Sequence, residues 1–348
     1  MQYFHLRILI LIFIALFGAT GCSSLASKSS QVNKGDMKSE TSYRVINLGL
    51  DFDAFWNLAK DKEFEEQVKV WNDKIEKPHQ VFYDGLVWQK MSNPKWEERK
   101  IRRLKEFFPK YQSLYPSMQS EFRHFDGTLE KQIKRFTQFF PDAHFNLPIY
   151  AVPSTTFNGK GGEGGDSGDP EGKTVLAFGI DMIVDRHDNP DVLYSHELFH
   201  IYHVSAIGMN EEVFVNEGRL TLPLWLEGLA TYISQQINPE APVADVLMDK
   251  DLSNVTKKQI RILAKKFISE ASEKAFDPKK PEIYKKWFAI DPQFKLGRGF
   301  PQRCGYLLGL KVSEYLAKKN SLETMVHWKV AEAHQQVLLT LKEIASEH

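Results

Sequence analysis

The feature that most constrains this chain is a pair of histidines in an otherwise apolar segment, residues 189–208. Asn189 and Pro190 are typical of a helix start, because asparagine caps the first turn and proline fits the first helical position. The residues that follow are apolar on nearly every side, which is typical of a buried helix. His196 and His200 are one turn apart, so their side chains lie on one face of that helix. A buried helix must provide two such polar groups with a partner.

The intervening Glu197 completes the pattern H-E-x-x-H. Two imidazoles at this spacing can bind one tetrahedral Zn²⁺. Glu197 points about 60° around the helix from His200, where it can hold a water and accept its proton. The pattern therefore predicts His196 and His200 as zinc ligands and Glu197 as a general base. The alternative is a pair of structural histidines in the core.

A second apolar segment, residues 224–232, contains one acid, Glu227. Pro223 can open a helix here, and Asn238 precedes a proline that ends it. Catalytic zinc sites use three protein ligands and leave the fourth position to water, so Glu227 is the predicted third ligand. Gly228 beside it would let two helices approach closely. The competing acids lie in the connector between the two helices: Glu211, Glu212 and Glu217.

The two segments read H-E-L-F-H and W-L-E-G-L-A-T-Y, and they resemble the gluzincin zinc metallopeptidases, in which the third ligand is a glutamate on a second helix. Within that group the chain looks most like a family of predicted zinc-dependent proteases whose ligand helix reads E-G-x-A. The resemblance covers roughly residues 145–330. It implies a zincin-like domain and the hydrolysis of peptide bonds by one Zn²⁺, and it is much less specific for the substrate.

Zinc hydrolysis also needs a donor for the negative charge that develops on the substrate oxygen. The segment R-C-G-Y-L-L-G, residues 303–309, resembles one that follows the ligand helix in the same family. Tyr306 is the first candidate for this donor, with core packing as its alternative. Arg303 is a weaker candidate, and His327 is a third.

Three further polar residues lie close to these segments in the sequence. His203 is one turn beyond His200, and we interpret it as a core residue or as a support behind the ligands, because a catalytic site needs an open position. Thr231, one turn after Glu227, is either a hydrogen-bond donor behind the ligand or a packing residue. Asp181 orients either a ligand or a loop.

The N-terminus is typical of a bacterial lipoprotein signal. Arg7 precedes an apolar run, residues 8–17, that is too short to span a membrane comfortably. The run ends in A-T-G-C, which is similar to the lipobox, so we expect cleavage after residue 21 and acylation of Cys22. No aspartate follows the cysteine, which by resemblance favours the outer membrane of a Gram-negative cell, facing the periplasm. An ordinary cleaved signal or a buried N-terminal cysteine is the alternative.

Composition bears on two questions: whether the protein binds nucleic acid, and whether disulfides stabilise it. The chain has 45 basic and 45 acidic residues, which gives no electrostatic case for nucleic acid. Its basic cluster is interpreted as a solvated helix face and comprises Lys100, Arg102, Arg103 and Lys105. If Cys22 is acylated, then Cys304 is the one remaining cysteine, no intrachain disulfide forms, and a packed core thiol is expected.

Periodicity predicts an α+β, mainly helical fold with a small sheet beside the cleft. The predicted parts are a signal peptide (1–21), an acylated cysteine with a flexible tether (22–42), a helical region (43–141) and the metallopeptidase domain (142–348). Strands are expected over 147–152 and 174–184. In gluzincins the strand before the H-E-x-x-H helix borders the cleft and pairs with an extended peptide.

Between the two expected strands, residues 159–172 are rich in glycine and are predicted to form a mobile loop. A phosphate cradle is the first alternative, but the Gly-Lys-Ser/Thr that would open a helix is missing. A Ca²⁺ site is the second, although the EF-hand spacing is absent, and its ligands would be Glu163, Asp166 and Asp169.

The residues themselves support zinc hydrolysis, and the resemblance implies a zinc-dependent peptidase of the cell envelope that acts on a peptide or protein. One alternative is a zinc-containing assembly or interaction lipoprotein without catalysis. Another is a zinc amidase that acts on a cell-wall substrate. A long groove with a free strand edge would favour peptides, whereas a closed pocket would favour a small substrate. The sequence leaves the oligomeric state open.

Overall fold

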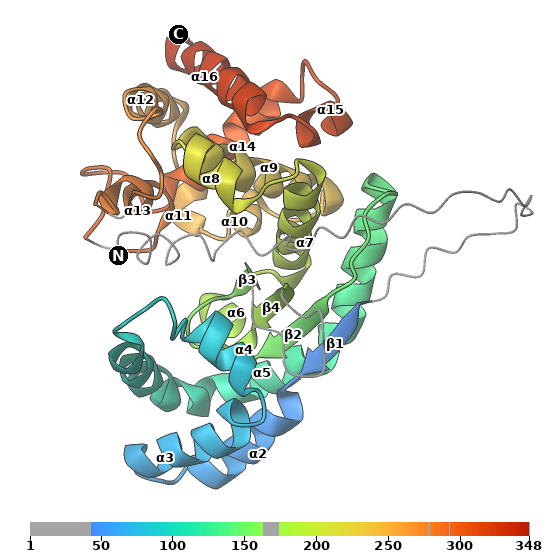
Figure 1. Ribbon diagram of the computed structural model, residues 1–348, viewed down its shortest axis with the longest axis vertical. Helices are drawn as coiled ribbons and strands as arrows, with labels where there is room; N and C mark the ends of the chain where they lie inside the picture. Colours follow the sequence, from blue (N-terminus) through green and yellow to red (C-terminus); the bar gives the residue numbers. More distant parts are fainter. Residues whose placement is uncertain (1–42, 163–173, 278, 292, 348) are drawn as a thin grey trace, which may run out of the picture.

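A computed structural model describes residues 43–162, 174–277, 279–291 and 293–347, and this part of the chain is mainly helical with one small mixed sheet (Figure 1). The expected α+β, mainly helical class is confirmed. The predicted signal peptide, Cys22, the tether and the three candidate Ca²⁺ ligands lie outside the described residues. None of the helices described is both long enough and apolar enough to cross a membrane.

The elements follow in chain order. The N-terminal part contains β1 (Arg44–Asn47), α2 (Gly49–Ala59), α3 (Phe64–Trp71), the π-helical η1 (Asn72–Glu76), α4 (Gln80–Phe82), the π-helical η2 (Tyr83–Val87) and α5 (Trp96–Phe139). The middle contains β2 (Pro148–Val152), β3 (Gly159–Gly162), β4 (Val175–Gly179), α6 (Ile180–Arg186), α7 (Pro190–Ala206), α8 (Glu211–Glu217) and α9 (Thr221–Ile237). The C-terminal part contains α10 (Val243–Val246), α11 (Lys250–Ser253), α12 (Lys257–Ile268), α13 (Glu282–Phe288), α14 (Cys304–Leu316), α15 (Leu322–Val326) and α16 (Val330–Ser346).

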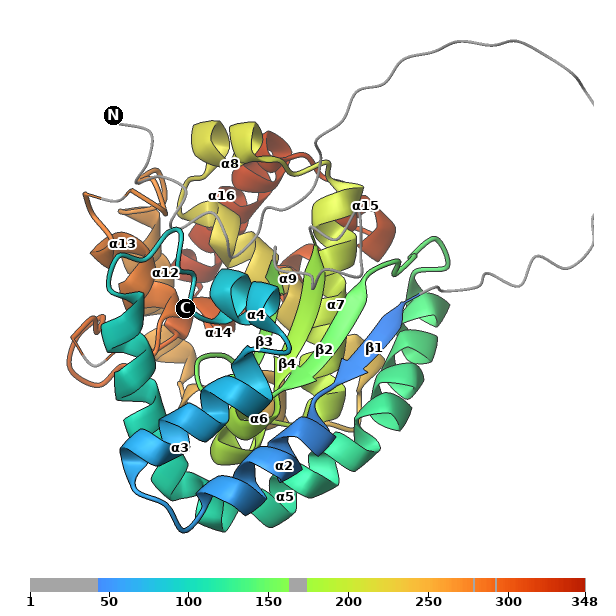
Figure 2. The ribbon, with the colours of Figure 1, turned by 60° about the horizontal axis from the view of Figure 1, so that its bottom comes forward.

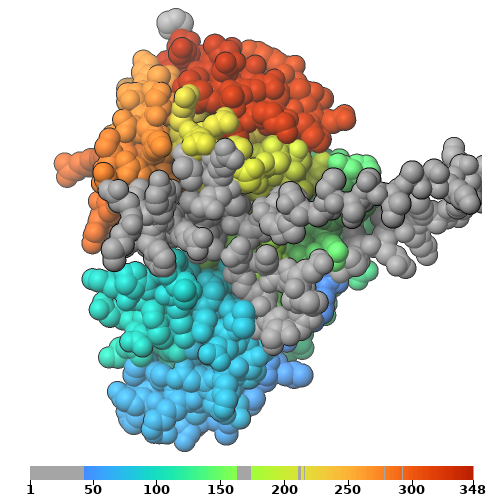
Figure 3. Space-filling view, viewed as in Figure 1, coloured from blue at the N-terminus to red at the C-terminus, as the bar shows by residue number. Residues whose placement is uncertain are grey.

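The four-stranded sheet lies in the middle of the molecule, with α2 and α3 at one end and α12 and α16 at the other (Figure 1). Figure 3 shows these two ends in blue and in orange to red. Its strand order is β1-β2-β4-β3, in which β1, β2 and β4 are parallel and β3 is antiparallel to β4. Every residue of β2 and β4 is buried, as expected for strands covered on both faces. The edge strand β3 contacts α7, the helix with the two predicted histidine ligands.

The sheet departs from the sequence prediction in three places. β1 lies in the region expected to be helical, and it pairs with β2 across the expected boundary at residue 141. The strand expected over 174–184 ends at Gly179, where α6 begins. Gly159–Gly162, expected in a loop, forms β3 instead. The sheet edge that contacts α7 is therefore β3, because β4 pairs on both sides and β1 forms the opposite edge. Glycine is disfavoured in strands, so only the pairing with β4 defines β3.

Helix α5 lies within the region expected to be helical and runs without interruption through Pro109 and Pro116. Proline removes one helical hydrogen bond and bends a helix, and Figure 2 shows α5 curving around the outside of the sheet. The helix also carries the basic cluster. Arg102 and Lys105 are exposed as predicted, but Lys100 is buried and pairs with the carboxylate of Glu76, so the solvated-face interpretation is wrong for Lys100.

Helix α9 packs against both α7 and α14, and this packing sets the position of the candidate site. A Cβ atom at Gly228 would lie 2.4 Å from the backbone of Gly309 in α14. Real Cβ atoms do not approach that closely, so the two glycines are what allow α9 and α14 to touch. The close approach expected at Gly228 is thus present.

Candidate metal centre

Helix α7 begins as the sequence predicted, and it places its two histidines side by side. The Asn189 side chain accepts a hydrogen bond from the Asp191 amide, and Pro190 is the first helical residue. His196 and His200 are 2% and 9% exposed, with their Nε2 atoms 3.0 Å apart. The helix therefore holds two imidazoles against each other in a buried position.

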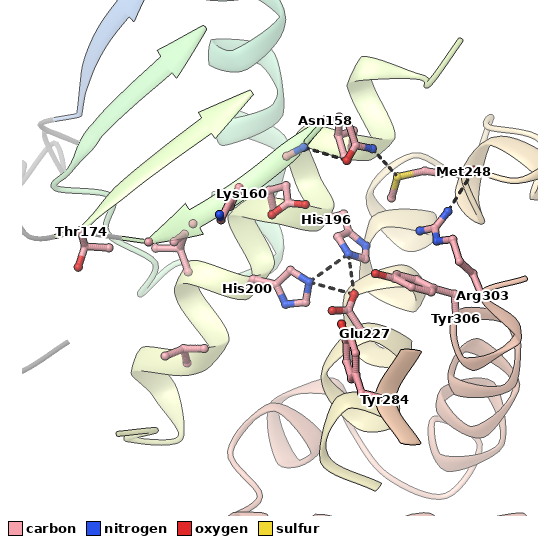
Figure 4. A pocket seen from close by; sticks show the side chains of 17 residues that line it. Asn158, Lys160, Thr174, His196, His200, Glu227, Met248, Tyr284, Arg303 and Tyr306 are labelled. Atoms are coloured by element: carbon pink, nitrogen blue, oxygen red, sulfur yellow. Dashed lines mark hydrogen bonds and ion pairs between the residues drawn. The ribbon is translucent and has the colours of Figure 1, made fainter. Parts of the chain in front are cut away.

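Glu227 of α9 completes a compact group with the two histidines (Figure 4). Its Oε2 atom lies 3.4 Å from Nε2 of His196 and 3.4 Å from Nε2 of His200, and the residue is 5% exposed. Glu217, one of the competing acids, is exposed on α8. The side chains of the other two, Glu211 and Glu212, are not among those the structure describes.

The three donor atoms fit a tetrahedral zinc ion. Bonds of 2.0–2.1 Å to nitrogen and oxygen place neighbouring ligand atoms of a tetrahedron about 3.3 Å apart. The observed separations are 3.0, 3.4 and 3.4 Å. Nitrogen and carboxylate oxygen are also the donor types that zinc accepts. The group can therefore hold a metal ion.

Electrostatics of the group suit a metal site as well. Burial lowers the pKa of His196 to about 4, so its imidazole is neutral and keeps a free lone pair. Burial lowers the pKa of His200 too, but the Glu227 carboxylate outweighs burial and raises it above its usual value. Burial raises the pKa of Glu227, and the two histidines more than reverse that shift, so the carboxylate stays ionised. A metal ligand must be deprotonated, and two of the three already are.

Glu197 lies on the wall of a cavity of about 160 Å³ that also contains the three donors. Burial raises its pKa to about 7; the His200 charge opposes that shift and the Glu227 charge adds to it. The backbone of β3 passes directly over this side chain, because a Cβ atom at Gly159 would lie 2.5 Å from Cγ of Glu197. A side chain at position 159 would therefore displace the Glu197 carboxylate, a role of glycine that sequence reasoning missed.

Tyr306 and Arg303 line the opposite side of the cavity (Figure 4). The Tyr306 ring is stacked on His196 at 6.3 Å between centroids, with 28° between the ring planes. Burial raises the pKa of its phenol, and the Glu227 charge adds to the shift, so the hydroxyl remains a proton donor. The third candidate, His327, is exposed and hydrogen-bonds to the Glu323 carbonyl, away from the cavity.

The remaining predicted polar residues lie outside the donor group. His203 is fully buried and packs edge-on against Trp225 at 4.5 Å, outside the donor group. The Thr231 hydroxyl donates to the backbone carbonyl of Glu227 at 2.7 Å rather than to its carboxylate. Cys304 is buried and donates to the Pro301 carbonyl, and burial raises its pKa to about 12, which makes it a poor nucleophile.

Asp181 orients a loop. Its carboxylate accepts hydrogen bonds from the Ser154 and Thr155 amides, both at 2.8 Å, and from the Tyr111 hydroxyl at 2.9 Å. Burial raises its pKa to about 6 against these donors. The loop that it holds leads into β3, so Asp181 supports the strand over Glu197 from a distance.

Sequence reasoning also missed Lys160 of β3, which lines the cavity. Its Nζ atom donates to the Leu86 carbonyl at 2.8 Å, and burial lowers its pKa to about 7. No local signal could have identified it, because its partner lies 74 residues earlier in the chain.

No protein-family model, curated protein or solved structure matches this chain. The likeness to the gluzincins therefore rests on the sequence motifs alone. The structure adds a mainly helical fold with a small mixed sheet, in which a buried group of two histidines and a glutamate can hold a metal ion.

Proposed function

We propose that this protein is a zinc-dependent peptidase with a zincin-like catalytic domain. The observation that carries the proposal is the triangle formed by Nε2 of His196, Nε2 of His200 and Oε2 of Glu227, whose sides match the edges of a tetrahedral zinc site. Glu197 in the same cavity distinguishes the site from a purely structural one, because a structural site has no use for a general base.

Each residue of the cavity has a distinct task in this proposal. Zn²⁺ held by the three donors would supply a Lewis acid and lower the pKa of a water. Glu197 accepts the proton of the attacking water and passes it to the leaving amine. Tyr306, which keeps its proton, donates a hydrogen bond to the oxygen on which negative charge develops.

A peptide is the substrate that suits the free edge of the sheet. β3 pairs with β4 on one side only, and it lies directly over Glu197. An extended peptide can add to such an edge through main-chain hydrogen bonds, which bring its carbonyl groups past the cavity. The resemblance implied this role for the strand before α7, which is β4; because β4 pairs on both sides, the neighbouring edge strand β3 takes this role in the proposal.

The sequence pattern at Cys22 supports a location of this activity in the cell envelope. Acylation there would anchor the domain to the outer membrane, facing the periplasm, since two lipid chains already suffice for stable anchoring. Cys22→Ser should abolish incorporation of labelled fatty acid and release the protein from membranes of a Gram-negative host. Labelling of the serine variant equal to that of wild type would refute acylation at this position.

The test of the catalytic proposal is zinc content together with cleavage of casein and of a mixed peptide pool. Glu197→Gln should keep stoichiometric zinc and lose about 10²- to 10⁴-fold in rate, the usual contribution of a general base. Glu217→Gln, which changes an exposed acid on α8, is the matched control and should cleave like wild type.

Three results would decide against this proposal or redirect it. Wild-type protein without stoichiometric zinc would refute the metal site. Zinc in both proteins without cleavage by either would favour the interaction lipoprotein without catalysis. Cleavage of a cell-wall amide, with casein and peptides untouched, would favour the amidase.

A further inference from the structure

Two cationic side chains of the cavity, Arg303 and Lys160, are not used by the hydrolysis proposed above. Arg303 immediately precedes α14, has a backbone φ of 56°, and is 6% exposed. It lines the same cavity as Glu197 and Glu227. A guanidinium stays charged at every accessible pH, and burying a charge is unfavourable unless it is paired. A buried arginine in a binding cavity therefore requires a partner.

The partners of Arg303 within the described residues are weak. Its Nη1 atom donates to the Met248 carbonyl at 3.3 Å, and the guanidinium lies 4.1 Å from the centre of the Tyr306 ring. A guanidinium has five N–H donors, and a single carbonyl and a ring face leave most of them without an anion. Arg303 forms no ion pair in the part of the chain that the structure describes.

The nearby acid Asp188 is already engaged. Its carboxylate lies 3.4 Å from Nε of Arg186 and accepts a hydrogen bond from the Asn158 amide at 2.8 Å. Arg186 also reaches the Met248 carbonyl, at 3.5 Å, so two guanidinium groups converge on one backbone oxygen. The charge of Asp249 also acts on both guanidinium groups, but its carboxylate caps α11 by accepting the Asp251 and Leu252 amides, and it forms no ion pair with either arginine among the described residues.

The guanidinium of Arg303 lies close enough to the donor triangle to contact a substrate bound there. The Tyr306 ring lies between the guanidinium and His196, 4.1 Å from the first and 6.3 Å from the second (Figure 4). An extended chain advances about 3.3 Å per residue, so a group bound by Arg303 would lie roughly one to three residues from a bond held at the donor triangle.

We propose that Arg303 binds a carboxylate of the substrate and so selects peptides that carry one within about three residues of the cleaved bond. This inference rests on the proposed peptidase function. The planar guanidinium matches a carboxylate through two parallel hydrogen bonds, a geometry that lysine cannot reproduce. The carboxylate can be the C-terminus of the peptide or the side chain of an aspartate or glutamate.

Lys160 is the rival cation in the cavity. It lies on β3, across His196 from Arg303 in Figure 4, and its Nζ atom is held by the Leu86 carbonyl. Its amine also loses charge near neutral pH, because burial lowers its pKa to about 7. Arg303 is thus the stronger anion partner, and Lys160→Met serves as the matched control.

The experiment measures binding without turnover. Zinc-loaded Glu197→Gln protein is titrated calorimetrically with N-acetylated tripeptides in three matched forms: free acid, C-terminal amide, and amide with one glutamate in place of glutamine. A carboxylate form should bind roughly 10- to 100-fold more tightly than the neutral amide, as expected for a charge-assisted pair. Tighter binding of the free acid identifies the C-terminus, and tighter binding of the glutamate form identifies an acidic side chain.

A carboxylate can also bind zinc directly, so the preference counts only if Arg303 causes it. Arg303→Gln should abolish the preference, Arg303→Lys should keep part of it, and Lys160→Met should keep it whole. Zinc content and the melting temperature of each variant show that the site is intact. Equal binding of acid and amide by the parent protein, or an undiminished preference in Arg303→Gln, would overturn the proposal.

Cleavage by otherwise wild-type protein separates this inference from the function on which it rests. If peptides are cleaved but acid and amide forms react equally, the peptidase stands and the role of Arg303 fails. If no peptide is cleaved although Arg303 governs binding of the carboxylate form, the peptidase fails and the anion site stands.

Discussion

Glu76 and Glu227 are both buried carboxylates, 8% and 5% exposed, and both lie among nitrogen-bearing side chains. Around Glu76 the nitrogens can only donate. Trp71 and Trp88 donate their indole N–H groups to Oε1 at 2.7 and 2.9 Å, and the ammonium of Lys100 contacts Oε2. Charge and hydrogen bonds are balanced within this cluster, so it needs nothing from outside.

Around Glu227 the nitrogens belong to imidazoles, which accept as readily as they donate. Two imidazole nitrogens and a carboxylate oxygen converge within 3.4 Å, and the low pKa of His196 leaves one of the rings without its extra proton. The neutral ring of His196 and the ionised carboxylate of Glu227 offer lone pairs toward a common centre, and a metal ion bound there would take the place of the proton on His200. The comparison teaches that the character of the partners, and not burial itself, separates a structural carboxylate from a metal ligand.

The largest effect is expected from removal of a ligand. Zinc binds to structural protein sites with apparent free energies of about 10–16 kcal/mol, so His200→Ala, which removes one donor of three, should lose several kcal/mol and retain no stoichiometric zinc. Metal analysis after gel filtration measures this. His203→Ala is the control, since that ring lies outside the donor group and should affect stability alone. Full zinc content in His200→Ala would show that the Glu227 group does not hold the metal, and it would then not differ from the Glu76 cluster in this respect.

The second prediction concerns the cluster around Glu76, in which charge and hydrogen bonds are balanced. Glu76→Ala leaves the Lys100 ammonium buried without its counter-ion, so unfolding in urea should show a loss of about 3–5 kcal/mol in stability with zinc content unchanged. The double variant Glu76→Leu with Lys100→Met removes both charges and should recover most of that loss. A loss below about 1 kcal/mol for Glu76→Ala would mean that the ion pair is dispensable.

Zinc itself should stabilise the fold. A ligand that binds only the folded state at 100 times its dissociation constant adds about 2.7 kcal/mol to the free energy of unfolding. The same increment is expected in Glu76→Ala, because the two clusters share no side chain, and none is expected in His200→Ala. Thermal unfolding with zinc and with a chelator tests this, and equal stabilisation of His200→Ala would show that zinc acts elsewhere.

The smallest effect is expected at Thr231. Its hydroxyl donates to the backbone carbonyl of Glu227, so Thr231→Val should cost about 0.5–1.5 kcal/mol of stability without weakening zinc binding. Competition with a chromogenic chelator measures the zinc affinity. A decrease of about 10-fold or more would instead make Thr231 a support of the ligand.

Local spacing predicted the parts of the site that share a helix. His196, Glu197 and His200 occupy the expected positions on α7, because the turn of a helix fixes side chains four residues apart on one face. Glu227 could be chosen because it is the one acid in an apolar helix, and a buried acid must have a partner. Helix α7 begins at Pro190 with Asn189 as its N-cap, as the capping preferences of these two residues predicted.

The parts of the site that lie far apart in the sequence were harder to predict. β3 consists of Gly159–Gly162, a composition that favours a loop, and only pairing with β4 makes it a strand. Lys100 looked like part of a solvated cationic face, but its burial depends on Glu76, 24 residues away. Partners at such separations leave no local signal in a single sequence.

The sequence by itself determined which side chains can hold a metal, because periodicity and burial act within single helices. Only the tertiary structure decided that α9 brings Glu227 to the two histidines, that Gly159 lets β3 cover Glu197, and that Arg303 enters the same cavity. The physical reason is that convergence of separate elements depends on packing and on long-range pairing. Those interactions become favourable only when the whole core has formed.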